Sequence, residues 1–267
     1  MCRAVIAGCV LALSLLAASS YGQTETDASP ACQTETQDAN SVEAILDRLE
    51  ARATKLDFYQ CRLDYIFKQP LLESQTRRQG TLAYGKFGKR SYLRIDFNTL
   101  QYDDEPQQPH KEQFLFDGIW GTYIDHQSHS AQRQQIGEPN APVDAFALVS
   151  RRVPVLGFSQ IDDLKKQFAI QQSPDSTSPS APSYHLHLTT LPGSAYHDDY
   201  VTIDVQIDKK CELPTKIVAV TTEQDVHEIV LAHPQINETI TKERFQVEIP
   251  SDFSVDTVPL KGSAASK

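Results

Sequence analysis

Residues 57–68 read Asp-Phe-Tyr-Gln-Cys-Arg-Leu-Asp-Tyr-Ile-Phe-Lys, and apolar and polar side chains alternate along most of this stretch. One face carries Tyr59, Cys61, Leu63, Tyr65 and Phe67. A period of two over this length is typical of a β-strand, and one apolar face is typical of an antiparallel sheet that is covered on one side. The stretch therefore predicts a long strand of such a sheet.

The same period recurs on both sides of this stretch. We predict strands at 57–68, 80–84, 91–97, 113–116, 120–124, 131–136, 184–188, 201–207, 215–221, 228–231 and 245–249. Asp117-Gly118 separates two of them and predicts a hairpin turn, because glycine tolerates the positive φ of tight turns. The short connections exclude repeated βαβ units, and a sheet of about eleven strands usually curls or closes. We expect a strongly curved antiparallel sheet.

Three segments instead show helical spacing. Ser41 is expected to cap a helix over 41–55, and shorter helices are expected at 142–152 and 161–168. We place these helices on the inner side of the sheet. The fold class is therefore mainly β with α (α+β).

The N-terminal residues 1–22 have the order of a secretory signal: Arg3, then an apolar run, then Ser20-Tyr21-Gly22. A retained anchor is the alternative, although the run is short for a bilayer of roughly 30 Å. The box Ile6-Ala7-Gly8-Cys9 does not predict lipidation, since most of the apolar run follows Cys9. We expect export to the periplasm, with a soluble protein after signal cleavage.

The remaining chain is expected to form one domain at 41–258. A polar, disordered lead-in at 23–40 precedes it, and a flexible tail at 259–267 follows. The Pro/Ser-rich segment 171–183 is interpreted as a loop within the domain, because strands occur on both sides of it.

The composition excludes some classes of partner. The 267 residues carry a formal net charge of −10, which argues against a nucleic-acid binder. The single methionine excludes a Met-lined binding surface.

Catalytic motifs are absent from the sequence. It has no Gly-rich phosphate loop, no Gly-x-Ser-x-Gly elbow and no His-Glu-x-x-His. His185 and His187 share a strand face, with His197 farther along, so a metal-dependent hydrolase stays open as an alternative. We favour the interpretation in which Tyr184, Leu186 and Leu188 face the core and the histidines face water. Asp103-Asp104-Glu105 suits a solvated loop, and Asp162-Asp163 the start of a helix. We predict no enzyme, no metal and no cofactor.

Three cysteines remain after signal removal. Cys61 and Cys211 flank predicted strands, whereas Cys32 lies in the polar lead-in. We favour a Cys61–Cys211 disulfide, and three free thiols are the alternative.

The order of several short motifs carries more information than any one of them. Gly80-Thr81-Leu82 follows the first strand, and Tyr92-Leu93-Arg94-Ile95-Asp96-Phe97 forms the third. Next come Phe116-Asp117-Gly118-Ile119-Trp120 and Tyr123-Ile124-Asp125, and the series closes with 245–250 and Phe253. Over residues 41–258 this order resembles the periplasmic outer-membrane lipoprotein carriers, the LolA type. The chain departs from that pattern before the third strand, where Gly88-Lys89-Arg90-Ser91 lacks a proline, and Trp120 is displaced.

The resemblance implies an unclosed half-barrel with a helical lid, whose cavity holds the acyl chains of lipoproteins. It implies that apolar residues of the inner strand faces and the lid bind lipid: Tyr59, Leu63, Tyr65, Phe67, Leu93, Ile95, Phe97, Trp120, Phe146 and Leu148. Lys89, Arg90 and Arg94 are expected at the rim or in contact with the lid.

The expected function is a monomeric periplasmic carrier that passes lipoproteins toward the outer membrane. An inner-membrane lipoprotein release complex and an outer-membrane receptor are the partners that the resemblance implies. The alternative is an envelope interaction or sensor module with the same fold, in which the chain's own side chains fill the inner face and a protein partner binds.

Overall fold

The computed structural model describes residues 40–150, 161–174, 178 and 180–260. The expected signal, most of the lead-in, the last two residues of the predicted helix 142–152 and most of the tail lie outside these residues. The chain divides into residues 1–36 and a compact unit of residues 37–267. Every element below belongs to the second unit.

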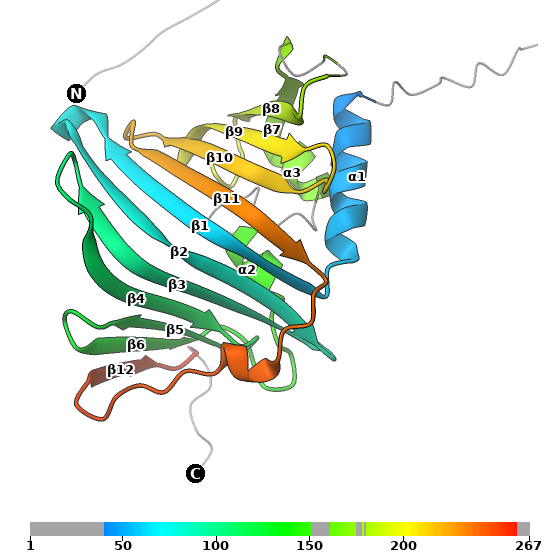
Figure 1. Cartoon of the computed structure of the whole chain (residues 1–267). Helices are drawn as coiled ribbons and strands as arrows, with labels where there is room; N and C mark the ends of the chain where they lie inside the picture. The colour runs from blue at the N-terminus through cyan, green and yellow to red at the C-terminus, as the bar shows by residue number, and fades with distance from the viewer. Residues whose placement is uncertain (1–39, 151–160, 175–177, 179, 261–267) are drawn as a thin grey trace, which may run out of the picture. The chain divides into compact units, whose positions relative to one another are not determined.

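One twelve-stranded sheet dominates this unit (Figure 1). Its order is β12-β6-β5-β4-β3-β2-β1-β11-β10-β9-β8-β7, so the long strand of the opening motif lies at its centre. Neighbours are antiparallel except β12 and β6, which are parallel. The strands are β1 (Phe58–Gln69), β2 (Ser74–Phe87), β3 (Arg90–Tyr102), β4 (Gln108–Phe116), β5 (Trp120–Asp125), β6 (Ser130–Gln135), β7 (Phe168–Gln172), β8 (Ser183–Thr190), β9 (Tyr200–Asp208), β10 (Pro214–Thr221), β11 (Val226–Ile236) and β12 (Ser254–Val258).

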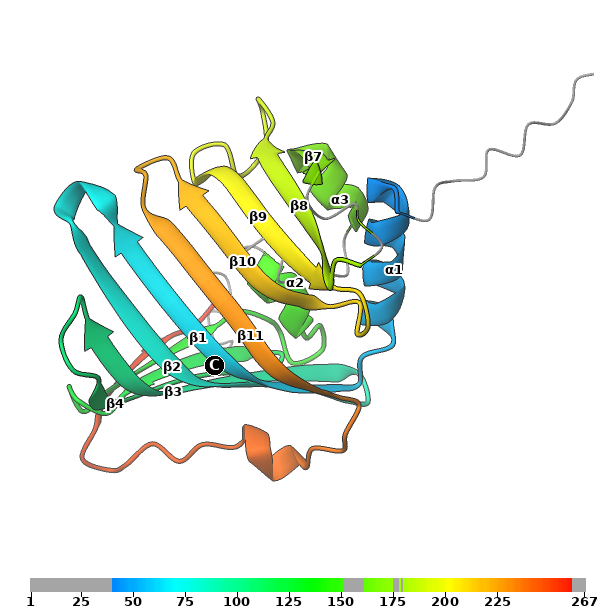
Figure 2. The ribbon, with the colours of Figure 1, turned by 45° about the horizontal axis from the view of Figure 1, so that its top comes forward.

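Within the described residues, three α-helices accompany the sheet. They are α1 (Val42–Thr54), α2 (Ala145–Ser150) and α3 (Ile161–Gln167). Ser41 caps α1 as predicted, and its side chain accepts a hydrogen bond from the Ala44 amide at 3.2 Å. Figure 2 shows the sheet curving around α2 and α3, which lie on its inner side. The predicted fold class, an unclosed half-barrel covered by short helices, is confirmed within the described residues.

The main hydrophobic core lies between the helices and the inner face of the sheet. Ile45, Leu46 and Leu49 of α1 and Leu164 of α3 are buried in it. The sheet contributes buried side chains from β4 through to β8 in its order, among them Tyr59, Cys61, Leu63, Tyr84, Leu93, Phe116, Leu186, Leu188, Ile203, Val205, Ile207, Ile217, Ala219 and Leu231. Apolar side chains at alternate strand positions thus meet the apolar stripe of α1.

The segment after β11 crosses the outer side of the sheet (Figure 2). We call residues 237–253 the strap; it contains the short helix η4 (Lys242–Phe245). Phe245 packs against Ala83 and Tyr92. Farther along, Val247, Ile249 and Phe253 pack on Leu115, Ile124 and Ala131.

The predicted strand at 245–249 is therefore wrong. Residues 245, 247 and 249 alternate because they contact the sheet from outside, and this gives the period of a strand without strand pairing. Two strands were not predicted. β7 has only five residues, too few to show a clear alternation, and the sequence prediction places its first residue, Phe168, in the preceding helix. Every residue of β12 is exposed, so β12 has no apolar pattern to find.

Candidate functional site

The strand register defines a concave face of the sheet. Leu63 on β1 pairs with Gly80 on β2, which pairs with Phe97 on β3. Paired residues of neighbouring strands point to the same side. Leu63 belongs to the core cluster that includes Ala145 of α2 and Leu164 of α3. This side therefore faces the helices inside the curve, and we call it the concave face.

All but one of the residues expected to bind lipid lie on this face or on α2. Tyr59, Leu63 and Leu93 are buried in the core, whereas Tyr65, Ile95 and Phe97 are partly buried against it. Phe67 has the same strand parity as Tyr65 and is also partly exposed. Phe146 and Leu148 of α2 pack on the same cluster. Lipid binding by these residues stays a prediction.

Trp120 is the exception, and its expected inward orientation is wrong. Its neighbour Gly121 pairs with Phe116, a residue of the concave core, so Trp120 points to the opposite, convex face. The preceding turn sets this register. Asp117 Oδ1 accepts hydrogen bonds from the amides of Ile119 and Trp120 at 2.9 and 2.7 Å, and Gly118 has φ +90°.

Side chains of the chain itself cover the concave face beneath α2. The Tyr84 and Phe146 rings stack with centroids 4.2 Å apart. The Ser91 hydroxyl donates to Asp144 Oδ2 at 2.8 Å and accepts from the Ala145 amide at 2.7 Å. Since Ser91 is the second residue of β3 and Asp144 precedes α2, these bonds fasten the helix to the sheet.

Toward the β1–β2 hairpin, the concave face becomes partly exposed and aromatic. The Tyr65 ring lies 6.4 Å from Phe97 and 6.1 Å from the His227 ring. Phe67 is 4.9 Å from His227. Tyr65 Oη and His227 Nδ1 are hydrogen-bonded at 2.8 Å. Burial lowers the pKa of His227 below its ordinary value, so this imidazole is neutral at pH 7.

A charged cluster stands beside these rings on the same face. Glu112 pairs across the sheet with Phe97 and is only 8% exposed. Its carboxylate binds Arg78 Nε at 3.0 Å and His110 Nε2 at 2.8 Å. Burial raises the pKa of Tyr123 to about 12, and the neighbouring Glu112 carboxylate adds to the effect. We call the concave-face residues Tyr65, Phe67, Phe97, Arg78, His110, Glu112, Tyr123 and His227 the open end.

The cations expected at the rim are separated by the fold. Lys89 is exposed in the β2–β3 turn, and Arg90 begins β3. Arg94 lies on the convex face, where it binds the Asp96 carboxylate at 2.8 and 2.9 Å and donates to the Arg244 carbonyl at 2.9 Å. The predicted rim or lid contact of Arg94 is therefore wrong, because its strand parity turns it toward the strap.

The expected disulfide is not formed, since Cys61 and Cys211 are both free thiols. Cys61 is buried on the concave face of β1, whereas Cys211 lies partly buried in the β9–β10 turn. The sequence prediction used only the position of each cysteine beside a strand. The sheet order, however, places β11 and β10 between β1, which carries Cys61, and the β9–β10 turn, which carries Cys211. Burial raises the pKa of Cys61 to about 11.

The histidine pair shares one carboxylate. His187 Nδ1 lies 2.9 Å and His185 Nε2 lies 3.4 Å from Asp204 Oδ1 on the outer side of β8 and β9. Leu186 and Leu188, which alternate with the two histidines along β8, are each 1% exposed, so the solvent-facing alternative describes this strand. Among the described residues, no group of three or more His, Cys, Asp or Glu side chains is placed to hold a metal ion.

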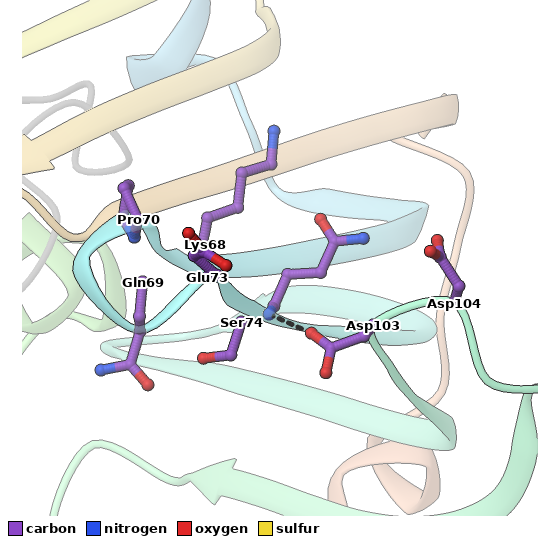
Figure 3. Close-up of a pocket in the computed structure, with 8 residues that line it drawn as sticks. Lys68, Gln69, Pro70, Glu73, Ser74, Asp103 and Asp104 are labelled. Carbon is purple, nitrogen blue, oxygen red and sulfur yellow. Dashed lines mark hydrogen bonds between the residues drawn. The ribbon is translucent and has the colours of Figure 1, made fainter.

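The acidic residues 103–105 form an exposed loop next to the β1–β2 hairpin. A surface pocket of about 310 Å³ lies there, lined by Lys68, Glu73, Ser74, Asp103 and Asp104 among others (Figure 3). Asp103 Oδ1 accepts from the Gln75 amide at 2.6 Å and so ties the two hairpins together. Leu71 and Leu72 at the hairpin tip are 74% and 69% exposed.

Sequence reasoning missed the polar members of the open end. Arg78, His110, Glu112 and His227 sit at inward positions of strands whose alternation is polar in that part. Reading β4 back from Phe116 and Phe114 would have placed Glu112 and His110 on the concave face. Nothing in the sequence pairs them with Arg78.

No protein-family model matches the sequence, and no curated protein matches it either. Solved structures do match. An uncharacterized conserved protein from Thermus thermophilus has a TM-score of 0.48 and 11% identity, covering 80% of this chain and 98% of that one. The Pseudomonas aeruginosa MucA/MucB complex gives a TM-score of 0.43 and 12% identity, covering 80% of this chain and 62% of that one.

A LolA superfamily protein from Nitrosomonas europaea also matches, with a TM-score of 0.35 and 11% identity, covering 77% of this chain and 97% of that one. The family that the sequence resembles is therefore among the structural matches. No helix in the described part of the chain has the length and apolar character needed to cross a membrane.

Proposed function

We propose that this protein is a non-enzymatic periplasmic carrier that holds the acyl chains of lipoproteins or other lipids on the concave face. The acyl chains would enter at the open end. The observation that carries the proposal is the partly exposed aromatic surface of Tyr65, Phe67 and Phe97, which continues into the buried core. Partly exposed apolar surface next to convergent polar groups is the usual composition of a ligand site.

The energetics suit an acyl chain. Each methylene that leaves water gains about 0.8 kcal/mol, so a chain laid along these rings would bind without any catalytic group. Arg78, His110 and the Tyr123 hydroxyl supply donors beside the rings. They would hold the ester or head group of a lipid while its chain contacts Phe97.

α2 would act as the cover of the site. Phe146 now occupies the surface above Tyr84, and a longer acyl chain would have to displace it. Transfer toward the outer membrane, from an inner-membrane release complex to an outer-membrane receptor, is the finer part of the proposal and rests on the sequence resemblance.

A fluorescent fatty-acid displacement assay tests the site. Phe67→Ser should weaken binding, whereas Ile66→Ser, the adjacent residue on the opposite face of β1, should not. Mass spectrometry of protein purified from a periplasmic extract should also find a bound lipid. Absence of both a bound lipid and displacement would contradict lipid binding.

One observation favours a second function, an envelope module that binds a protein partner. The Tyr84–Phe146 stack and the buried Ala145 show that the chain's own side chains occupy the concave face beneath α2. In that case Phe146→Ala would lower stability without creating fatty-acid binding. A carrier would instead accept fatty acid more readily once the Phe146 ring is removed.

A further inference from the structure

A second cavity lies on the side of the sheet opposite the proposed acyl-chain site. It has a volume of about 480 Å³ and lies between the strap and the convex face of β3 to β6. Tyr92, Leu115 and Trp120 line it from the sheet, and Phe245 and Val247 line it from the strap. The volume lies within the roughly 300–1,000 Å³ of small-molecule sites, and the lining is rich in aromatic rings.

Two cations face this cavity, each placed over a ring. Arg133 Cζ lies 5.0 Å from the Trp120 ring centroid, and Lys242 Nζ lies 5.6 Å from that of Tyr92. Within the described part of the chain, neither has a carboxylate within ion-pair distance, although the strap and sheet pair other cations, such as Arg94 and Arg244 with Asp96. Two cations that have no carboxylate within ion-pair distance in the described residues, beside a cavity lined partly by aromatic rings, favour an anion.

The carboxylate that lines the cavity limits the charge of that anion. Asp117 Oδ1 already accepts two backbone hydrogen bonds in its turn. The negative charge of Asp117 offsets one of the two positive charges of Arg133 and Lys242. One positive charge is then left for the ligand to balance. A ligand with two or more negative charges would be repelled by Asp117.

We propose that this cavity binds a small organic monoanion with a flat apolar body, such as an aromatic carboxylate or sulfonate. The body would lie among Trp120, Tyr92 and Phe245, and the anionic group would contact Arg133 and Lys242. The site is independent of acyl-chain binding, because the sheet separates the two faces.

The probe is 8-anilinonaphthalene-1-sulfonate, and Trp120 is the reporter because it is the only tryptophan of the chain. The dye should quench Trp120 emission in a saturable manner. Arg133→Gln with Lys242→Gln should weaken this binding at least about tenfold, as expected for lost hydrogen bonds to a charged group. Arg133→Lys with Lys242→Arg keeps both charges and should retain most of the affinity.

Two controls separate the sites. Lys86→Gln with Lys165→Gln removes the same charge at exposed positions and should leave the affinity unchanged. Phe67→Ser alters only the open end and should also leave it unchanged. Affinity that is unaffected by the Arg133/Lys242 glutamines, or abolished by Phe67→Ser, would overturn the proposal. Equal quenching by the neutral analogue N-phenyl-1-naphthylamine would overturn the anionic class of ligand.

Discussion

Ser91 on β3 and Asp144 before α2 are joined by a hydrogen bond of 2.8 Å between the serine hydroxyl and the carboxylate, although 53 residues separate them. The same hydroxyl accepts the amide of Ala145. One buried side chain, near the start of β3, thus attaches α2 to the concave face. We expect this attachment to hold α2 in place over that face.

Ser91→Ala should lower the free energy of unfolding by about 1–3 kcal/mol, because it leaves the buried Ala145 amide without a partner. Urea denaturation measures the change. Ser74→Ala, at a partly exposed serine that begins β2, is the control and should stay within about 0.5 kcal/mol of the parent. Equal effects of the two variants would contradict an anchoring role for Ser91.

Asp96 should make stability depend on acid pH. Burial by itself would raise the pKa of Asp96, but hydrogen bonds from Arg94 and Gln113 and the charges of Arg94 and Arg244 lower it below the ordinary value. A lowered folded-state pKa gives stability that is complete above the unfolded value of about 3.9 and is lost as the pH falls through the folded pKa.

Asp96→Asn should therefore be less stable than the parent at pH 7, and the difference should shrink below about pH 4. Thermal melts across pH 2.5–7 measure this. A difference that is constant over that range would show that the carboxylate charge is not what holds the strap.

Gly80→Ala should destabilise the sheet by about 3 kcal/mol or more, since a Cβ at this position would lie 1.8 Å from the Asp96 carbonyl oxygen. Gly88→Ala has open space around it but a φ of +63°, so it should cost only about 1–2 kcal/mol. Denaturant midpoints compare them. A larger loss for Gly88 would show that the β2–β3 register at Gly80 relaxes easily.

Cys61 should resist iodoacetamide at pH 8 in the folded protein, because burial raises its pKa to about 11. After denaturation without reductant, both Cys61 and Cys211 should become alkylated. Peptide mass spectrometry reads both results. Labelling of both only after reduction would instead show that each is part of a disulfide.

His185→Gln with His187→Gln should leave metal content unchanged and stability within about 1 kcal/mol, because the ion pairs of both histidines with Asp204 are partly exposed to solvent. Elemental analysis and thermal melts give the two measurements. Loss of a bound metal in the double variant would revive the hydrolase hypothesis.

The spacing of apolar residues along the chain was sufficient to predict most of the strands and the helices that cover the sheet. The alternation in 57–68 predicted β1 and its apolar face, and the spacing after Ser41 predicted α1 with its cap. Both signals follow from the period of one element against one apolar surface. They can therefore be recognised without knowing which elements lie next to them. The same alternation, in 57–68 and in 91–97, predicted that Tyr65, Phe67 and Phe97 face inward.

Only the tertiary structure decided which partners these elements meet. Residues 245–249 of the strap have the period of a strand because they pack on the sheet from outside. Trp120 points to the convex face because a single-residue change of register reverses a side chain, whereas Arg94 does so because it alternates with the inward residues Leu93 and Ile95. The ion pair of Arg78 with Glu112 joins β2 to β4. The cavity lined by Arg133 and Lys242 lies between β6 and the strap. Pairing across strands depends on sheet order and register, and neither is encoded in the period of a single strand.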